Sequence, residues 1–275
     1  MSEPTAPSTP TEVVVIAHSP LFYWWPVWAV GFLMAGLTYL YGYQVALVPT
    51  GTEARQAATI EGVAGKRDVL IVPADTSLPS IADTDELKQP RLRMVATNDL
   101  GIVWAMTLCL VVIFTNIPLR GLWSFMVIIV IVFSTILLAV LGLWDPILRS
   151  IRVIDIHLTA FSYLSISTVL LVLWLITFLF FDRLTYMVFT RGQLRVRMAI
   201  SQGETVFDTR GMVVERHRDD LFRHWLLGFG SGDLTVRTGG SNSQTLQLPN
   251  VLAVSRRLGL INTMLQEREV VKGTR

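Results

Sequence analysis

The sequence contains one cysteine, Cys109, and few charged residues, which make up 16% of its 275 positions. A single cysteine excludes an intramolecular disulfide and a metal site built from several thiolates. Because Cys109 lies in an apolar run, we expect it to be a small buried side chain. An ordinary soluble domain carries about 25% charged residues. Here the shortage of charge is concentrated in a few long stretches, which is typical of a membrane protein rather than of a globular core.

Four stretches of the chain contain no Asp, Glu, Lys, Arg or His at all. They are residues 21–44, 100–117, 122–144 and 158–181. A helix of about 20 residues crosses a hydrocarbon core of about 30 Å, so each stretch is long enough. An unpaired backbone amide is costly in lipid, which makes a helix the expected structure throughout. Trp and Tyr residues flank the first and third stretches, as expected at the headgroup zone. The sequence therefore predicts a membrane region over residues 20–181 with four transmembrane helices.

The connections between these spans differ in length. Residues 116–121 alone join the second span to the third, which predicts a tight antiparallel hairpin. Between the third and fourth spans, residues 145–157 place apolar side chains at helical spacing, which fits either a short helix lying in the interface or a frayed span end. The loop 46–99 is polar; within it residues 68–73 predict a strand and residues 87–94 another short element.

Charge is distributed unevenly about the spans. From residue 182 onward there are 14 basic and 9 acidic residues, a net charge of +5, whereas the rest carries 9 and 12, a net charge of −3. Four spans place both termini on one side, and the basic C-terminal part favours the cytoplasmic side of the membrane, although the count over all loops is close to even. Residues 1–19 are expected to form a disordered tail, because residues 1–11 are rich in Ser, Thr and Pro. The first span is too long for a cleaved signal, so we expect a retained anchor.

After Phe181 the apolar residues begin to alternate, which predicts the half-buried strands of a small antiparallel sheet. The alternating apolar positions are Leu184, Tyr186, Val188, then Leu194, Val196, Met198, Ile200, then Leu234, Val236, and finally Leu246 and Leu248. Gly192 and Gly203 are expected to supply positive φ in hairpin turns. Asn250 is the expected N-cap of a final helix, and the apolar stripe of that helix should pack on the sheet. The stripe comprises Val251, Val254, Leu258, Ile261 and Leu265. We therefore expect an α+β domain over residues 182–268, followed by a tail of residues 269–275.

The motifs of this domain carry a family resemblance over about the last third of the chain. They are Tyr186-x-x-x-Thr190-x-Gly192-x-Leu194, Leu221-Phe222-Arg223, Gly228-x-Gly230-x-Gly232-Asp233-Leu234-x-Val236-x-Thr238, and Leu246-x-Leu248-Pro249-Asn250-Val251. Together they resemble the bacterial PH domains of membrane-flanked proteins, a family that includes the YdbS-like proteins. The resemblance implies a PH-like fold beside the membrane, and it implies no catalytic residues.

Basic side chains of the C-terminal domain are candidates for contact with anionic lipid headgroups, where each contributes about 1 kcal/mol. They are Arg191, Arg195, Arg197, Arg216, Arg218 and Arg223. The alternative is that these arginines only keep a small domain soluble. A metal site from His217, Asp219, Asp220 and His224 is a weaker hypothesis than a solvated surface.

The spans bear on the choice between function classes. Ion and proton pathways usually need ionisable groups inside the membrane, and these spans have none. The leading hypothesis is a non-catalytic membrane protein for assembly, scaffolding or headgroup contact, with membrane lipid and other membrane proteins as partners. No cofactor, metal or nucleic acid is expected. A transporter or channel subunit is the alternative, and a membrane enzyme is a more distant one.

Overall fold

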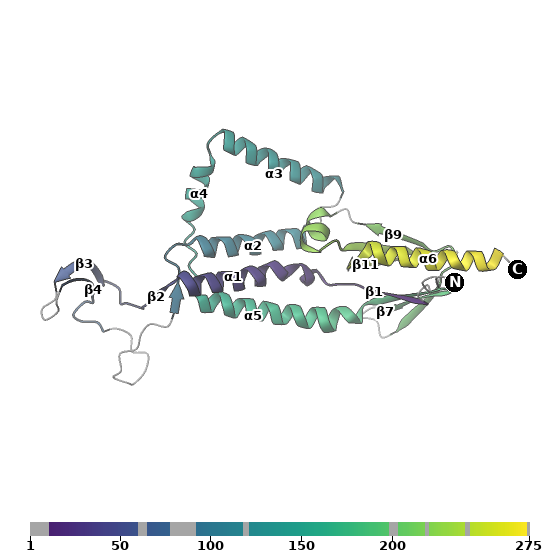
Figure 1. The fold of residues 1–275 in the computed structure, drawn as a ribbon, viewed down its shortest axis with the longest axis horizontal. Helices are drawn as coiled ribbons and strands as arrows, with labels where there is room; N and C mark the ends of the chain where they lie inside the picture. Colours follow the sequence, from purple (N-terminus) through teal and green to yellow (C-terminus); the bar gives the residue numbers. More distant parts are fainter. Residues whose placement is uncertain are drawn as a thin grey trace, which may run out of the picture.

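The computed structural model describes residues 11–59, 65–77, 92–117, 121–197, 203–217, 220–239 and 243–273. The molecule is elongated, with helices in its middle and a sheet domain at one end (Figure 1). A small β-hairpin lies at the other end, which we call the distal end of the spans (Figure 1).

The four predicted spans are confirmed as helices that are long and apolar enough to cross a membrane: Pro20–Tyr41, Asp99–Asn116, Leu122–Val140 and Ala160–Leu184. The first consists of a 3₁₀ turn, η1 (Pro20–Trp24), and α1 (Trp25–Tyr41). The second is α2 (Asp99–Asn116) and the third is α3 (Leu122–Val140). The fourth is α5 (Ala160–Ile176), which continues through a π-helical turn, η2 (Thr177–Phe181), and a 3₁₀ turn, η3 (Asp182–Leu184). The first span stops at Tyr41 rather than at residue 44, because the chain turns extended at Gly42 and enters a strand.

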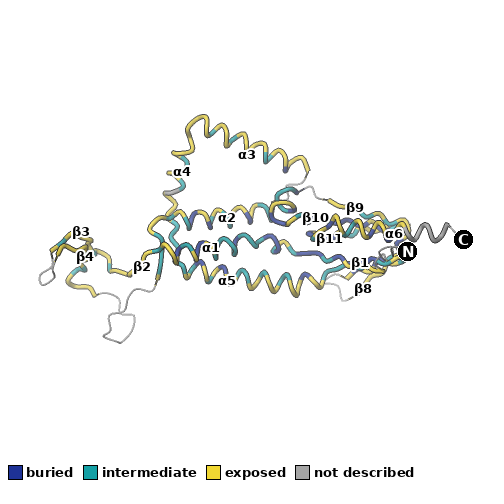
Figure 2. The backbone as a smooth tube through the Cα atoms, in the orientation of Figure 1, coloured by how far each residue is buried: buried dark blue, intermediate teal, exposed yellow. Residues whose placement is uncertain are grey.

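The first, second and fourth spans pack closely, and the third, α3, does not. Gly31 of α1 lets α1 approach α5 and α2: a Cβ there would lie 2.0 Å from Ser167 Oγ and 2.9 Å from Trp104 Nε1. Helix α3 instead diverges from α2 (Figure 1) and is exposed along almost its whole length (Figure 2), with Ser124 as its one buried residue. The predicted tight hairpin of the second and third spans is therefore wrong. The large apolar side chains of α3 offer few of the small or polar groups that hold membrane helices together.

Cys109 is also exposed on the protein surface, so the prediction of a buried thiol is wrong. It lies on α2, and in a spanning helix an outward-facing apolar residue can meet lipid as readily as protein. The sequence cannot distinguish these two environments, because both are apolar.

The distal end carries two small sheets and a short helix. Strand β2 (Tyr43–Val45) pairs with β5 (Leu92–Met94), and β3 (Glu53–Thr59) pairs with β4 (Lys66–Ile71). Strand β4 confirms the strand predicted near residues 68–73; the element predicted over 87–94 lies outside the described residues except for its end, which is β5. Helix α4 (Trp144–Arg152) begins after a turn in which Gly142 has φ +66°, and it leads from the end of α3 to the distal end of α2, crosswise to α2 (Figure 1). This placement favours the short interfacial helix over a frayed span end.

The sheet domain consists of two antiparallel sheets and a helix. The first sheet has the order β1-β6-β7-β8 and the second has the order β11-β10-β9. Their strands are β1 (Glu12–Ile16), β6 (Tyr186–Thr190), β7 (Gln193–Arg197), β8 (Glu204–Asp208), β9 (Val213–His217), β10 (Gly232–Arg237) and β11 (Thr245–Val251). Helix α6 (Val254–Gly273) closes the domain. The turn at Arg191-Gly192 joins β6 to β7 as predicted, but Gly192 is not among the glycines with positive φ. Residues 198–202 of the predicted strand and turn lie outside the described residues.

Both sheets and α6 share one core. The buried members are Val13, Val15, Ala17, Met187, Phe189, Leu194, Val196, Leu234, Val236, Leu248, Val251, Val254, Ile261 and Met264. The predicted stripe of the last helix is confirmed in outline, since Val254 and Ile261 are fully buried and Leu258 and Leu265 pack at the edge of the core. Arg257 adds a hydrogen bond from α6 to the carbonyl of Val14 in β1.

Strand β1 corrects the predicted domain boundaries. Residues 1–19 were expected to be a disordered tail, yet Glu12–Ile16 pairs along its whole length with β6. Val13 and Val15 enter the core while Val14 faces outward, which is the pattern of a half-buried strand. The sheet domain therefore combines residues 12–16 with the segment after residue 185, and the four spans lie between its first and second strands. At the other end, α6 continues to Gly273, so the tail expected from residue 269 is helical over most of its length.

Candidate functional site at the junction of the spans and the sheet domain

The chain passes between the sheet domain and the spans twice, after β1 and before β6, and a buried carboxylate joins these two crossings. Asp182, at the end of the fourth span, accepts a hydrogen bond from the backbone N–H of Ser19 at 3.0 Å. Its other oxygen lies 2.9 Å from Nδ1 of His18, just before the first span. Asp182 is 4% exposed and His18 is 9% exposed. A paired carboxylate with its oxygens satisfied is the condition under which such a buried charge is tolerated.

An aromatic layer covers this pair on the side of the spans. The ring of His18 stacks on Phe178 at 5.2 Å between centroids and lies 5.4 Å from Phe22. Trp174 stacks on Phe178 and donates its indole N–H to the carbonyl of Phe22 at 3.0 Å. The layer therefore ties the start of the first span to the end of the fourth, and it keeps the Asp182 carboxylate away from the apolar middle of the bundle.

Tyr23 connects the first span to the second sheet. Its hydroxyl donates to Oδ1 of Asn250 at 2.8 Å and lies 3.1 Å from Oγ of Ser231 and 3.3 Å from Nδ1 of His224. The side chain of Tyr23 is fully buried. A Cβ at Gly228 would lie 2.7 Å from the Tyr23 ring, so a glycine at this position leaves room for the ring.

Asn250 is the link between both crossings. Its side-chain amide donates to the carbonyl of His18 at 2.8 Å, while its oxygen accepts from Tyr23. Its backbone has φ +57° and its N–H donates to Oδ1 of Asp233 at 3.0 Å. Asn250 was expected to cap the last helix. That prediction is wrong, because the side chain turns toward the spans and α6 begins only at Val254.

A charged layer lies behind Tyr23. Nη2 of Arg223 lies 3.2 Å from Oδ2 of Asp233, and Asp220 accepts the backbone N–H of Arg223 at 2.9 Å. Nε2 of His224 lies 3.7 Å from Asp233. Burial alone would raise the pKa of the Asp233 carboxyl, but the neighbouring His224 ring, the hydrogen bond from the Asn250 N–H and the positive charge of Arg223 hold that pKa below its ordinary value.

Ser231, His224 and Asp233 stand in the order of a hydrolytic triad. Oγ of Ser231 lies 3.2 Å from Nδ1 of His224, whose other ring nitrogen faces Asp233. A nucleophile, however, must reach its substrate. Ser231 is fully buried and Tyr23, also fully buried, contacts its hydroxyl. In this structure the three residues hold the segment between η4 (Leu221–Leu227) and β10 in place.

The structure does not bring the six candidate headgroup arginines together. Arg191 lies at the turn after β6, about 16 Å of strand away from the spans. Arg195 is 4.0 Å from Glu204, and Arg216 donates to Ser255. Arg197 lies opposite Tyr186, at the end of the sheet near the spans, and Arg223 is engaged within the junction. Arg218 lies outside the described residues.

The weaker metal hypothesis gains no geometric support. Asp220 and His224 face separate partners within the junction, and His217 lies 3.4 Å from Thr235 of the neighbouring strand. Asp219 is outside the described residues. Across the described part of the chain, no three His, Cys, Asp or Glu side chains gather as metal ligands would.

Comparison with known proteins adds no relative. No protein-family model matches the chain, and neither the curated proteins nor the solved structures contain a match.

Proposed function

We propose that the protein is a non-catalytic membrane protein whose sheet domain is a PH-like module, held in a fixed orientation at the membrane surface for assembly or scaffolding. One observation carries the proposal: the spans leave the sheet domain after β1 and return to it at β6, and these two strands pair directly. The domain is therefore attached through two adjacent connections rather than through one linker.

The buried polar contacts of the junction make that attachment rigid. Rotating the sheet domain against the spans would separate Tyr23 from Asn250 and His18 from Asp182. Each buried polar group left without a partner costs about 1–3 kcal/mol. A fixed domain presents the same surface to every partner, which suits a scaffold better than it suits a tethered domain that must search for its target.

Two features support the PH-like assignment. Seven strands in sheets of four and three, closed by one C-terminal helix over a common core, agree with the plan of a PH fold. Some of the residues that carry the family resemblance also have a structural role here. Gly228, Asp233 and Asn250 form part of the junction.

We place the sheet domain on the cytoplasmic face of a bacterial cell membrane. Support comes from the net charge of +5 from residue 182 onward. Of the candidate headgroup arginines, Arg197 has the position best suited to reach lipid, because its end of β7 lies beside the spans. We therefore propose a headgroup contact at Arg197, and none at Arg191, which lies at the far end of β6.

The surface proposed for assembly is the pair of sheet edges β8 and β9. Each has one hydrogen-bonded neighbour among the described strands, and each exposes a valine, Val206 at 51% and Val213 at 50%. A partner strand can pair with such an edge, and the exposed valines would then be covered.

The test is photo-crosslinking of the full-length protein in its native membrane from Val206 and Val213. The control position is the exposed Val153, which directly follows α4. We expect discrete protein adducts from the two edge positions, absent at the control and weakened by Asn250→Ala. The same protein adducts at all three positions, the control included, would contradict the proposal. So would a proton or potassium flux through vesicles that contain the purified protein, because such a flux would establish the transport alternative.

A further inference from the structure

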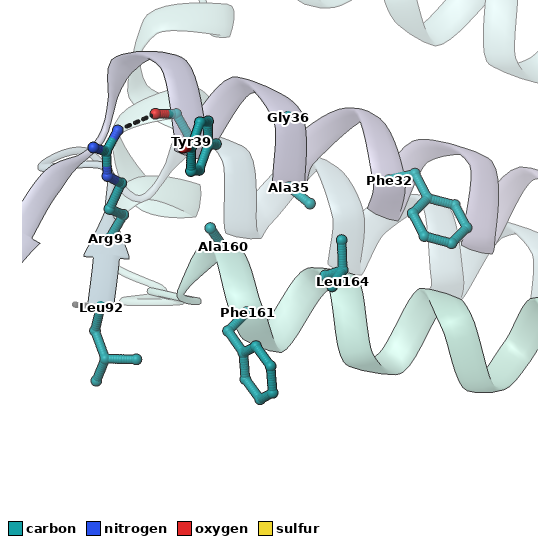
Figure 3. Close-up of a pocket in the computed structure, with 9 residues that line it drawn as sticks. All are labelled: Phe32, Ala35, Gly36, Tyr39, Leu92, Arg93, Ala160, Phe161 and Leu164. Carbon is teal, nitrogen blue, oxygen red and sulfur yellow. Dashed lines mark hydrogen bonds between the residues drawn. The ribbon is translucent and has the colours of Figure 1, made fainter.

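A groove of about 480 Å³ lies at the distal end of the spans, between α1 and α5 (Figure 3). It is separate from the junction and from every residue that the scaffold proposal uses. Its walls are apolar side chains of the two helices, and strand β5 closes its mouth with Leu92 and Arg93. A volume of this size is in the range of sites that bind small ligands.

The floor of the groove is hollow because its residues are small. Ala35 and Gly36 of α1 and Ala160 of α5 are the small residues that line it. A Cβ added at Gly36 would meet no atom within 4 Å. Phe32 and Leu164 continue the groove toward the middle of the spans. The space therefore suits an extended apolar chain.

Arg93 is held in place at the mouth. Its Nη1 donates to the carbonyl of Tyr39 at 2.6 Å, and its guanidinium carbon lies 4.6 Å from the centre of the Tyr39 ring. The pairing of β5 with β2 sets the backbone of Arg93 opposite Gln44. Among the described residues no carboxylate lies within ion-pair distance of this guanidinium. The remaining donors of its planar fork match the geometry of a phosphate.

The depth of the groove in the membrane follows from its position on α1. Tyr39 is in the last turn of the span, next to Tyr41 and Tyr43, and such rings favour the headgroup zone. Phe32 lies seven residues deeper, which is about 10 Å along the helix axis. A cationic mouth at headgroup depth thus leads into an apolar groove at acyl-chain depth.

We propose that this groove binds one anionic phospholipid from the membrane leaflet opposite the sheet domain. Its phosphate contacts Arg93, and one acyl chain lies between α1 and α5 above Gly36. Basic side chains between membrane helices are a known means of headgroup recognition. A zwitterionic lipid has the same chain but no net negative charge, so the charge of Arg93 sets the preference.

The experiment uses the full-length protein in nanodiscs of mixed phosphatidylglycerol and phosphatidylcholine, with native mass spectrometry of the released protein. We expect one retained lipid, enriched in phosphatidylglycerol over the nanodisc composition. Arg93→Gln should lower that enrichment about fivefold, the ratio expected for one basic side chain at an anionic surface. Arg93→Lys should keep part of it. Arg67→Gln, an exposed arginine of β4 on the same side, is the matched control and should change nothing.

Gly36→Leu tests the groove independently, because the new side chain has room to fold without a clash and fills the floor. We expect it to remove the retained lipid of either kind. Gly259→Leu on α6, another glycine with open space around it, should retain that lipid. A phosphatidylglycerol probe with a photoreactive acyl chain should label α1 and α5. Equal enrichment in the wild type and Arg93→Gln, lipid retention in Gly36→Leu, or labelling confined to other helices would each overturn the proposal.

Discussion

The hydroxyl of Tyr23 and the side-chain oxygen of Asn250 lie 2.8 Å apart although 227 residues separate them in the sequence. Tyr23 lies in the first turn of the first span, and Asn250 is the penultimate residue of the last strand. Their hydrogen bond, with the His18–Asp182 pair beside it, makes one structural unit of the spans and the sheet domain.

Tyr23→Phe removes that hydroxyl while keeping the ring. The Asn250 oxygen then loses its donor in a buried site, and we expect the protein to lose roughly 1–3 kcal/mol of stability. The measurement is the apparent melting temperature of the purified full-length protein. Tyr41→Phe is the control, because Tyr41 is 73% exposed at the opposite end of α1. An equal effect of both substitutions would show that the junction does not bear on stability.

Val15→Asp tests whether β1 belongs to the sheet domain. Val15 is fully buried, so the aspartate would place an uncompensated charge in the core at a cost of about 3–5 kcal/mol. The neighbouring Val14→Asp is the matched control, since Val14 is 40% exposed. Limited proteolysis of the full-length protein should show rapid cleavage within the sheet domain only for Val15→Asp. If residues 1–19 were a disordered tail, both variants would resist protease as the wild type does.

The sequence predicts the spans well because a membrane helix is recognised from what it lacks. About 20 residues without an ionisable side chain suffice, and no knowledge of the partner helices is needed. The alternation at Leu234 and Val236 and the apolar stripe through Ile261 are equally local signals, and both elements form. The divergence of α3 was not predictable, because a short connection limits only the ends of two helices.

The junction was missed because its signals are divided over the whole chain. Strand β1 has five residues, too few for a clear period, and its partner follows 170 residues after it. Asn250 before an apolar stripe reads as a helix cap, and only the fold brings Tyr23 to its side chain. A usable signal did exist: His18 and Asp182 are ionisable residues directly bordering the first and the last span.

Gly31→Ala tests the close contact of the spans. The added methyl group would overlap Ser167 and the indole nitrogen of Trp104, so something must shift, at a cost of about 1–3 kcal/mol. Gly36→Ala is the same substitution in the same helix, where nothing lies within 4 Å. It should leave stability unchanged or raise it by up to about 1 kcal/mol, because alanine favours the helix. If Gly31→Ala and Gly36→Ala lowered the melting temperature by the same amount, this packing would be contradicted.

The lowered pKa of the Asp233 carboxyl leads to a prediction of how the stability of the sheet domain depends on pH. Its pKa is lower in the folded protein than in the unfolded chain, where it is near 3.8. The carboxylate therefore contributes its full stabilisation above about pH 4, and this contribution is lost as the pH falls through the lower, folded-state pKa. Asp233→Asn should melt at a lower temperature than the wild type at neutral pH, because Arg223 and His224 lose their anionic partner.

The difference between wild type and Asp233→Asn should then shrink as the pH is lowered, because protonation makes the wild-type side chain neutral as well. Melting temperatures of both proteins measured from neutral pH down to about pH 3 test this. Glu215→Gln is the matched control, since Glu215 is a partly exposed carboxylate of β9 that lies 3.7 Å from Arg237. A surface pair of this kind contributes little, so its variant should follow the wild type throughout. A constant gap between Asp233→Asn and the wild type over the whole range would mean that the Asp233 side chain stabilises the junction by its shape and hydrogen bonds rather than by its charge.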